Sequence, residues 1–113
     1  MAAEKQFENR IKNYLKSKNC YCVKYFGCMY STSGTPDLLT CINGYFVAIE
    51  VKAQDGEPSE LQLQKIKDIR KAGGFAYVVY PSGWNKLKDI IDGILEDKFN
   101  KDEEMILKWS YTN

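Results

Sequence analysis

The sequence predicts an α/β domain built around a mixed β-sheet, and two features of the chain carry that prediction. Asn43-Gly44 separates two β-type runs, Leu38 to Ile42 and Tyr45 to Ala53, and this dipeptide is the strongest short signal for a two-residue hairpin. A helical pattern from Ser59 to about Ala72 then leads to another apolar strand, Phe75 to Tyr80. A strand, a helix and a strand in this order indicate a right-handed crossover with parallel pairing beside the antiparallel hairpin.

The rest of the chain supplies the flanking elements. Glu4 to about Lys18 has apolar residues at helical spacing, and Cys20 to Phe26 is strand-like. Gly27 to Pro36 is rich in Gly, Ser and Thr and is predicted to be a loop. After a turn at Pro81, a last helix carries an apolar stripe that is typical of core packing.

One domain accounts for the whole chain. A length of 113 residues allows one hydrophobic core and leaves no room for a separate specificity domain. We therefore expect a single domain over residues 1–113, with its core over about 4–97 and a C-terminal tail over 98–113. Within the tail, Met105 to Tyr111 alternates in polarity and is predicted to be an edge strand.

Composition excludes several kinds of chemistry. The chain contains no histidine, which removes Ser-His and Cys-His nucleophilic catalysis and the commonest transition-metal ligand. Its net charge of +1 argues against binding nucleic acid through bulk positive charge. No stretch is long and apolar enough to span a membrane, so we expect a cytoplasmic protein without a membrane partner. The cysteines should be reduced there, and their spacing lacks paired zinc knuckles: Cys20, Cys22, Cys28 and Cys41.

The hairpin brings two carboxylates together. If Asn43-Gly44 closes a two-residue turn, pairing proceeds outward until Asp37 lies opposite Glu50 on one face of the sheet. Directly opposed residues have Cβ atoms about 4.5–5.5 Å apart, a spacing at which like charges destabilise a sheet. Something is therefore expected to compensate the two carboxylates.

Lys52 lies on the same face as Glu50, because alternate residues of a strand face the same side. Lys52 is two positions after Glu50, so their Cα atoms are about 6.6 Å apart along the strand. Mg²⁺ or Mn²⁺ suits this face, since hard cations take oxygen ligands and keep bound water. Asp37 and Glu50 would bind the metal, with the carbonyl of Val51 as a third ligand. Lys52 would orient the attacking water and stabilise charge on a phosphate.

A purely structural interpretation of these residues is that Asp37 begins a strand while Glu50 and Lys52 form an exposed ion pair, worth about 0–1 kcal/mol. An isolated E-x-K would favour that interpretation. Here the hairpin register independently places an aspartate opposite the glutamate, on strands that are otherwise apolar. This coincidence favours a catalytic site.

The motifs also form an ordered set: Gly34-Thr35-Pro36-Asp37, then Ala48-Ile49-Glu50-Val51-Lys52, then Ser59-Glu60-Leu61-Gln62. In this order they resemble the VRR-NUC branch of the PD-(D/E)xK nucleases, over about residues 4 to 80. The resemblance implies a restriction-endonuclease-like core, in which a mixed sheet with a catalytic β-hairpin is flanked by helices. It further implies metal-dependent hydrolysis of DNA phosphodiesters at Asp37, Glu50 and Lys52.

The resemblance implies two further site residues. A glutamate on the first helix falls on Glu8 or, one turn earlier, on Glu4, and Glu8 is preferred; either is otherwise an ordinary solvated charge. A glutamine that opens the second helix falls on Gln62, with Gln64 as a weaker substitute. Gln62 also completes a capping box with Ser59, and both roles are compatible.

DNA contacts are expected in the loop before Asp37, where hydroxyls and amides of Ser33, Gly34 and Thr35 can approach a phosphate. Small stand-alone members of the family, often encoded by bacteriophages, resemble Holliday junction resolvases. A four-way junction needs paired incisions, so a two-fold homodimer is expected. Two alternatives remain, a flap or nicking repair nuclease and a catalytically silent DNA-binding module.

Overall fold

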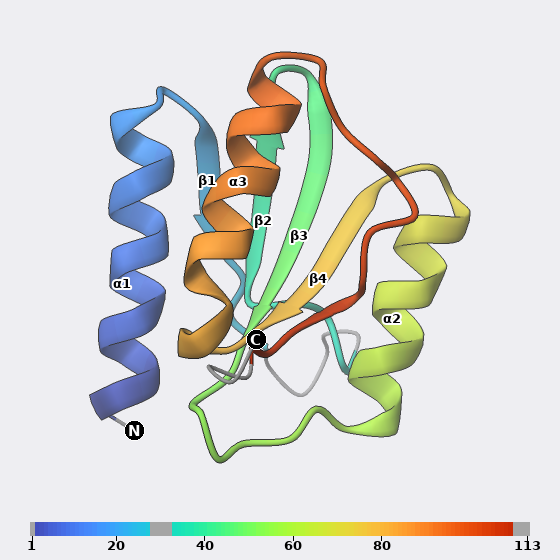
Figure 1. Ribbon diagram of the computed structural model, residues 1–113. Coiled ribbons are helices and arrows are strands. Elements are labelled where there is room, and N and C mark those ends of the chain that lie inside the picture. The colour runs from blue at the N-terminus through green and yellow to red at the C-terminus, as the bar shows by residue number, and fades with distance from the viewer. Residues whose placement is uncertain (1, 28–32, 110–113) are drawn as a thin grey trace.

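A computed structural model describes residues 2–27 and 33–109, which form a five-stranded sheet with three α-helices against it (Figure 1). The strand order is β1-β2-β3-β4-β5. Strands β1 to β3 are antiparallel, whereas β4 runs parallel to both β3 and β5, so the predicted mixed sheet is confirmed. The elements in chain order are α1 (Ala2–Ser17), β1 (Tyr21–Lys24), β2 (Leu38–Ile42), β3 (Tyr45–Val51), α2 (Glu60–Lys71), β4 (Phe75–Val79), a 3-10 turn (Pro81–Gly83), α3 (Trp84–Leu95) and β5 (Ile106–Leu107).

The hairpin between β2 and β3 has the predicted turn and register. Asn43 and Gly44 both have positive φ, 52° and 83°, as a type I′ turn requires. Ile42 pairs with Tyr45, and the ladder continues to Leu38 opposite Ile49. The Asn43 side chain also donates a hydrogen bond to the carbonyl of Ile94 at 3.0 Å, which ties the turn to the end of α3.

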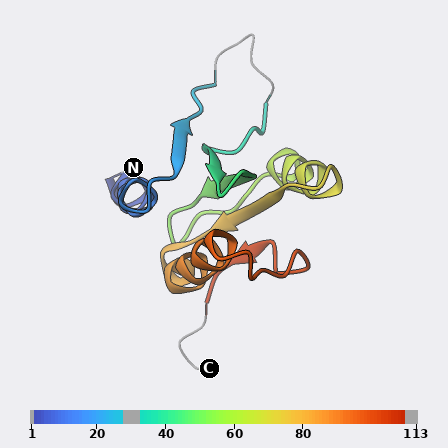
Figure 2. The same cartoon turned by 90° about the horizontal axis from the view of Figure 1, so that it is seen from above.

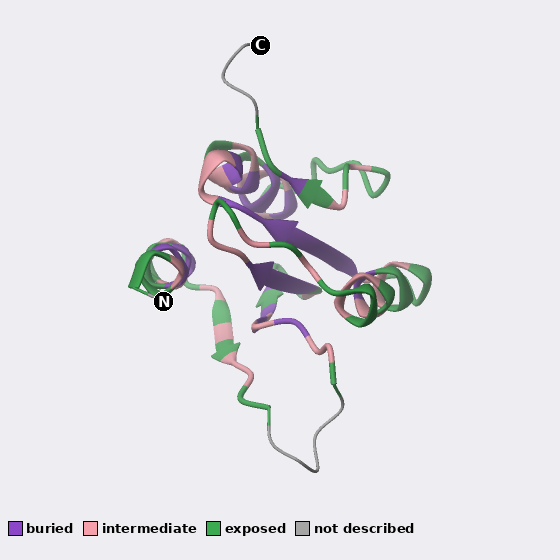
Figure 3. Ribbon diagram, turned by 90° about the horizontal axis from the view of Figure 1, so that it is seen from below, coloured by how far each residue is buried: buried purple, intermediate pink, exposed green. Residues whose placement is uncertain are grey.

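Helices cover both faces of the sheet. Figure 2 shows α1 and α3 on one side and α2 on the other. The central strands β3 and β4 are buried almost throughout, as Figure 3 shows in purple. Val47, Ile49 and Val51 belong to the core under α1 and α3, whereas Ala48 packs toward Ile66 of α2. The predicted alternation along β3 is therefore confirmed, and Glu50 belongs to the α2 side.

Element boundaries differ from the predicted ones. Helix α1 begins at Ala2 rather than Glu4, and β1 covers only the middle of the predicted run from Cys20 to Phe26. The chain turns into β1 at Asn19, whose φ is 60°. In the tail only Ile106 and Leu107 form a strand, and Leu107 is buried in the core. None of the helices in the described part of the chain is long and apolar enough to cross a membrane.

Arg70 of α2 closes the outer edge of β4. Because β5 is two residues long, no strand within the described residues pairs with the first half of that edge. The Arg70 guanidinium donates to the carbonyl of Ala76 at 2.9 Å, and to those of Glu103 and Glu104 at 2.7 and 3.1 Å. These charge-assisted hydrogen bonds join α2, β4 and the segment that precedes β5.

Candidate active site

Asp37 and Glu50 lie at one end of the β2–β3 hairpin. The outermost pair of the ladder is Leu38 with Ile49, and Asp37 and Glu50 are the next residues outward along these two strands. The backbone amide of Val51 donates to Asp37 Oδ2 at 2.8 Å, which fixes the aspartate against the end of β3. The Asp37 carbonyl accepts from the amide of Tyr25 at 2.8 Å. Two backbone hydrogen bonds thus hold Asp37 beside Glu50.

Glu50 is a buried carboxylate with one uncommitted oxygen. Glu50 is 2% exposed. Its Oε2 accepts a hydrogen bond from Gln62 Nε2 at 2.9 Å and lies 3.4 Å from Lys52 Nζ. Within residues 2–27 and 33–109, Oε1 is buried without a hydrogen-bond partner. Burial raises the pKa of Glu50 to about 7; the Asp37 carboxylate raises it as well, while Lys52 opposes the rise. A buried carboxylate oxygen without a partner lowers the stability of the fold, so we expect a cation or a proton to bind at Oε1.

Gln62 combines the two roles that the sequence suggested. The side-chain oxygen Oε1 of Gln62 accepts a hydrogen bond from the backbone amide of Ser59 at 2.9 Å. The backbone amide of Gln62 donates to Ser59 Oγ at 3.1 Å, so the capping box is complete. Its Nε2 remains available and donates to Glu50. Gln64 instead donates to Asp68 on the exposed side of α2 and does not reach the site.

Glu8 is joined to the site through Lys24. Glu8 is only 3% exposed, and its Oε1 lies 2.7 Å from Lys24 Nζ, which lies 3.4 Å from Asp37 Oδ1. Burial lowers the pKa of Lys24, but the hydrogen bond to Glu8 and the nearby Asp37 carboxylate outweigh it and raise the pKa. Glu4 is half-buried and lies one turn away from this contact. The structure therefore brings Glu8, rather than Glu4, into line with Asp37.

Lys24 is a residue of the site that the sequence analysis did not identify. Its side chain is 22% exposed and is held between two carboxylates. A signal was present in the alternation of β1, because Lys24 shares a side with Cys22, which packs against the core beside α1. A lysine on the covered side of a strand needs an acidic partner, and Glu8 supplies it.

The loop before Asp37 packs against the start of α2. Gly34 has φ 82°, and a Cβ there would lie 2.9 Å from Leu61 Cγ and 3.0 Å from the Leu61 carbonyl carbon and oxygen. Ser33 is exposed and Thr35 is half-buried. The preceding part of the loop, 28–32, lies outside the described residues. DNA contacts by Ser33, Gly34 and Thr35 stay a prediction.

The close approach of Gly34 to Leu61 has a measurable cost when it is disturbed. We expect Gly34→Ala to lower the free energy of unfolding by about 2–4 kcal/mol, because a positive φ and a steric clash both oppose the added Cβ. Gly44→Ala is the matched control, since Gly44 has φ 83° with nothing within 4 Å of an added Cβ. Its loss should be only about 1–2 kcal/mol. Urea unfolding measures both; equal losses would mean that the contact with Leu61 carries no strain.

The donor set suits a hard cation held by few protein ligands. Within residues 2–27 and 33–109, no group of three or more His, Cys, Asp or Glu side chains is arranged to hold a metal ion. Asp37 and Glu50 supply two carboxylates, and Mg²⁺ is commonly held by one or two carboxylates together with water. The free Oε1 of Glu50 is an oxygen donor without a competing bond. The residues present therefore fit Mg²⁺ or Mn²⁺ better than a metal that needs several nitrogen or sulfur ligands.

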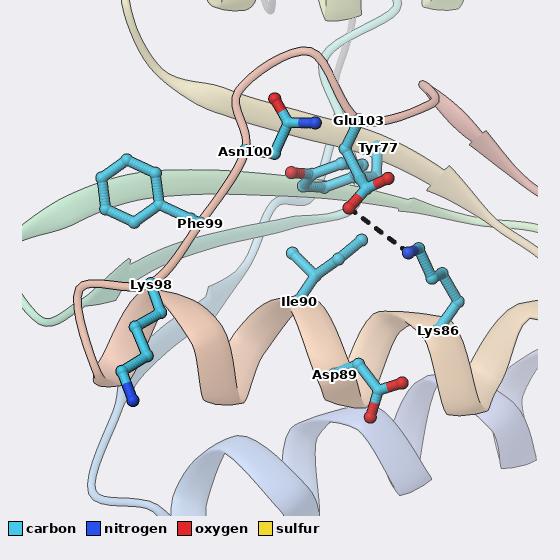
Figure 4. Close-up of a pocket in the computed structure, with 8 residues that line it drawn as sticks. All are labelled: Tyr77, Lys86, Asp89, Ile90, Lys98, Phe99, Asn100 and Glu103. Atoms are coloured by element: carbon cyan, nitrogen blue, oxygen red, sulfur yellow. Dashed lines mark ion pairs between the residues drawn. The ribbon is translucent and has the colours of Figure 1, made fainter.

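A separate pocket of about 480 Å³ lies on the α3 side of the sheet (Figure 4). An ion pair between Lys86 and Glu103, 3.3 Å apart, spans one wall. Burial raises the pKa of Tyr77 at its base to about 12, so this phenol stays protonated at neutral pH. In the described part of the chain, the buried carboxylate oxygens without hydrogen-bond partners belong to Glu8 and Glu50, neither of which lines this pocket. The site at Asp37 and Glu50 is therefore the better candidate for chemistry.

No protein-family model matches the chain, and no curated protein matches it. The function is accordingly inferred from the residues of the site.

Proposed function

We propose that this protein is a divalent-metal-dependent, structure-specific DNA endonuclease whose reactive residues are Asp37, Glu50 and Lys52. The observation that carries the proposal is the Glu50 carboxylate. It is buried, has one oxygen without a hydrogen-bond partner among the described residues, and lies between a second carboxylate and a lysine. Glu8 is the other described residue with such an oxygen, and that oxygen lies 3.8 Å from the ammonium groups of Lys5 and Lys12. The free oxygen of Glu50 instead belongs to a carboxylate beside Asp37 and Lys52, where a metal-dependent phosphodiesterase would bind its cation.

Each residue has a role that its contacts support. Asp37 and Glu50 would hold the metal, with the Val51 carbonyl beside them; the bound ion would supply Lewis acidity toward the phosphate and lower the pKa of a water molecule. Lys52 is close enough to Glu50 to stabilise negative charge on the phosphate and to orient the attacking water. Gln62 keeps Glu50 Oε2 occupied, which directs Oε1 toward the ligand.

Glu8 and Lys24 would act on Asp37 indirectly. The Lys24 ammonium lies 3.4 Å from Asp37 Oδ1 and holds this side chain in position, and Glu8 in turn holds the ammonium at 2.7 Å. These are positioning roles, since neither side chain needs to contact the phosphate. The mixed sheet with Asp37 and Glu50 on its hairpin is consistent with a restriction-endonuclease-like core of the VRR-NUC type, which we include in the proposal.

We further propose that the substrate is a four-way DNA junction and that a homodimer cuts it. The described part of one chain offers one site of this kind, and two symmetric incisions need two sites related by a two-fold axis. A flap or nicking nuclease would use the same residues as a monomer. A silent DNA-binding module is less consistent with an intact Asp37, Glu50 and Lys52.

A substrate panel tests the proposal. Purified full-length chain with Mg²⁺ or Mn²⁺ should cut labelled four-way DNA at two symmetric positions, and EDTA should stop the reaction because the carboxylates alone cannot activate water. Linear, nicked and flap DNA serve as comparisons, and light scattering under the same conditions should give a dimer. A monomer that cuts flaps and ignores junctions would replace the resolvase function with the flap nuclease. Failure to cut any of these DNAs would refute the nuclease.

A further inference from the structure

The ammonium group of Lys24 lies between two carboxylates that come from different parts of the fold. Lys24 is the last residue of β1, and its register partner Leu38 directly follows Asp37. Its Nζ lies 2.7 Å from Glu8 Oε1 and 3.4 Å from Asp37 Oδ1. Glu8 belongs to α1, which lies beside β1 (Figure 1). One cation that is part of the chain therefore connects α1 to the strand end that carries Asp37.

Asp37 can accept from Lys24 and still bind a metal ion. Its Oδ2 accepts from the backbone amide of Val51 at 2.8 Å, and Oδ1 is the oxygen that lies near Lys24. Each carboxylate oxygen has two lone pairs, so an ammonium group does not exhaust Oδ1. Glu50 Oε1, which has no hydrogen-bond partner among the described residues, is the other oxygen available to the ion. Asp37 would then interact with two cations, the divalent ion and the Lys24 ammonium.

A pair of cations at the reacting phosphate is a common arrangement in nucleases. Two-metal sites hold their ions about 3.5–4 Å apart. Here Glu8 would be the carboxylate for a second ion, because it is buried and faces Asp37 across a single side chain. That side chain is Lys24. Consistently, Glu8, Asp37 and Glu50 do not form a three-carboxylate metal group within residues 2–27 and 33–109.

The charges of the site favour one divalent ion. When ionised, Glu8, Asp37 and Glu50 carry three negative charges, and Lys24 and Lys52 supply two positive ones. One divalent ion and one phosphodiester would bring this group to neutrality. A second divalent ion would leave two positive charges uncompensated, beside residues that are 3% and 2% exposed at Glu8 and Glu50. Unpaired charge in a buried site is strongly unfavourable.

We propose that the Lys24 ammonium takes the place of the second metal ion of a two-metal site, so that each active site binds one divalent ion. The proposal rests on the proposed function and makes it more specific, because it assigns a one-metal reaction to this nuclease. Removal of the Lys24 charge frees Glu8 Oε1 and Asp37 Oδ1, and the unpartnered Glu8 Oε2 lies on the same carboxylate. These oxygens create a position for a second ion.

Counting bound ions tests this proposal without any DNA. At pH 8 and saturating Mn²⁺, equilibrium dialysis should give one ion per chain for the wild type and two for Lys24→Met, which keeps an unbranched side chain and removes its charge. Electron paramagnetic resonance should show isolated Mn²⁺ in the wild type and a spin-coupled pair in Lys24→Met. Two ions in the wild type, or one ion in a folded Lys24→Met protein, would overturn the proposal.

Lys12→Met is the matched control, because Lys12 also lies beside Glu8, 3.8 Å from Oε2, and undergoes the same change in charge. It should still bind one ion. A second ion in Lys12→Met would mean that loss of any nearby positive charge recruits metal, and the assignment to Lys24 would be wrong. Lys24→Arg keeps the charge and should bind one ion as well.

The stability of Lys24→Met gives a second measurement. The substitution leaves Glu8 buried without its nearest cation, so the metal-free variant should melt at a lower temperature than the wild type. Mn²⁺ should raise its melting temperature more than that of the wild type, because two ions rather than one bind to the folded state. A variant that stays unfolded at saturating Mn²⁺ would contradict the proposal, since the second ion should replace the ammonium. Glu8→Gln combined with Lys24→Met should bind one ion; two would show that Glu8 does not hold the second.

The outcomes also separate the role of Lys24 from the nuclease. One ion in the wild type and two in Lys24→Met, in a protein that cuts no DNA, would support the role of Lys24 and refute the proposed function. Metal-dependent cleavage by a wild type that binds two ions per chain would support the nuclease and refute the role of Lys24. A wild type that binds no Mn²⁺ would refute both.

Discussion

Glu50→Gln will reduce the single-turnover rate of DNA cleavage by roughly 100- to several-thousand-fold, which corresponds to about 3–5 kcal/mol of lost transition-state stabilisation. Glutamine has nearly the same shape as glutamate but carries no charge, so it removes a metal ligand while it keeps the side chain in place. Gln62 and Lys52 then lose the acceptor charge that orients them.

Glu60→Gln is the matched control for this substitution. Glu60 is an exposed residue in the first turn of α2, two positions before Gln62, and the change in charge is identical. Its cleavage rate should stay within about twofold of the wild type. Asp37→Asn and Lys52→Ala should be inactive in the same assay. Rapid cleavage by a folded Glu50→Gln protein would show that the carboxylate is structural.

In the absence of divalent metal, the stability of the wild type will fall as the pH rises from about 4.5 to about 7. The pKa of Glu50 is raised from 4.5 to about 7 in the folded chain, so the folded state holds this proton more tightly than the unfolded state does. Protonation therefore stabilises the fold below pH 4.5, and the contribution is lost as the pH rises through 7. The difference between the folded-state and unfolded-state pKa values corresponds to about 3 kcal/mol in the free energy of unfolding.

Urea unfolding across this pH range, in EDTA, measures the effect as a difference between wild type and Glu50→Gln. The variant cannot ionise at this position, so above pH 7 it should be the more stable protein, by up to about 3 kcal/mol. Glu60→Gln should follow the wild type. Adding Mg²⁺ at pH 8 should stabilise the wild type more than Glu50→Gln, because binding to the folded state shifts unfolding by linkage. A Glu50→Gln protein that is less stable than the wild type at pH 8 would contradict this account.

Local rules predicted the part of the site that the hairpin and the α2 cap determine. Asn43-Gly44 fixed the register of β2 against β3, and alternation from that turn put Glu50 and Lys52 on one side. The capping box at Ser59 placed Gln62 at the start of α2. These features depend on neighbours within a few residues, for which turn and capping preferences are strong.

Such local rules could not predict the contacts made by Lys24. Lys24 and Glu8 are 16 residues apart, and their distance depends on how α1 packs against β1, which no local pattern encodes. The length of β1 was overestimated for a related reason, since its ends depend on pairing with β2 rather than on its own composition. The restriction-endonuclease-like identity of the core remains a proposal, because a mixed α/β sheet is common to many functions.

The guanidinium of Arg70 also has a consequence for self-association. Unpaired strand edges are templates on which other chains add, and proteins protect them to avoid aggregation. A charged side chain that occupies the carbonyl of Ala76 prevents a foreign strand from docking on the first half of β4. At the opposite margin β1 is only four residues long, shorter than the six or seven residues typical of fibril-forming segments. Arginine at one margin and a short strand at the other should keep this sheet from growing into fibrils.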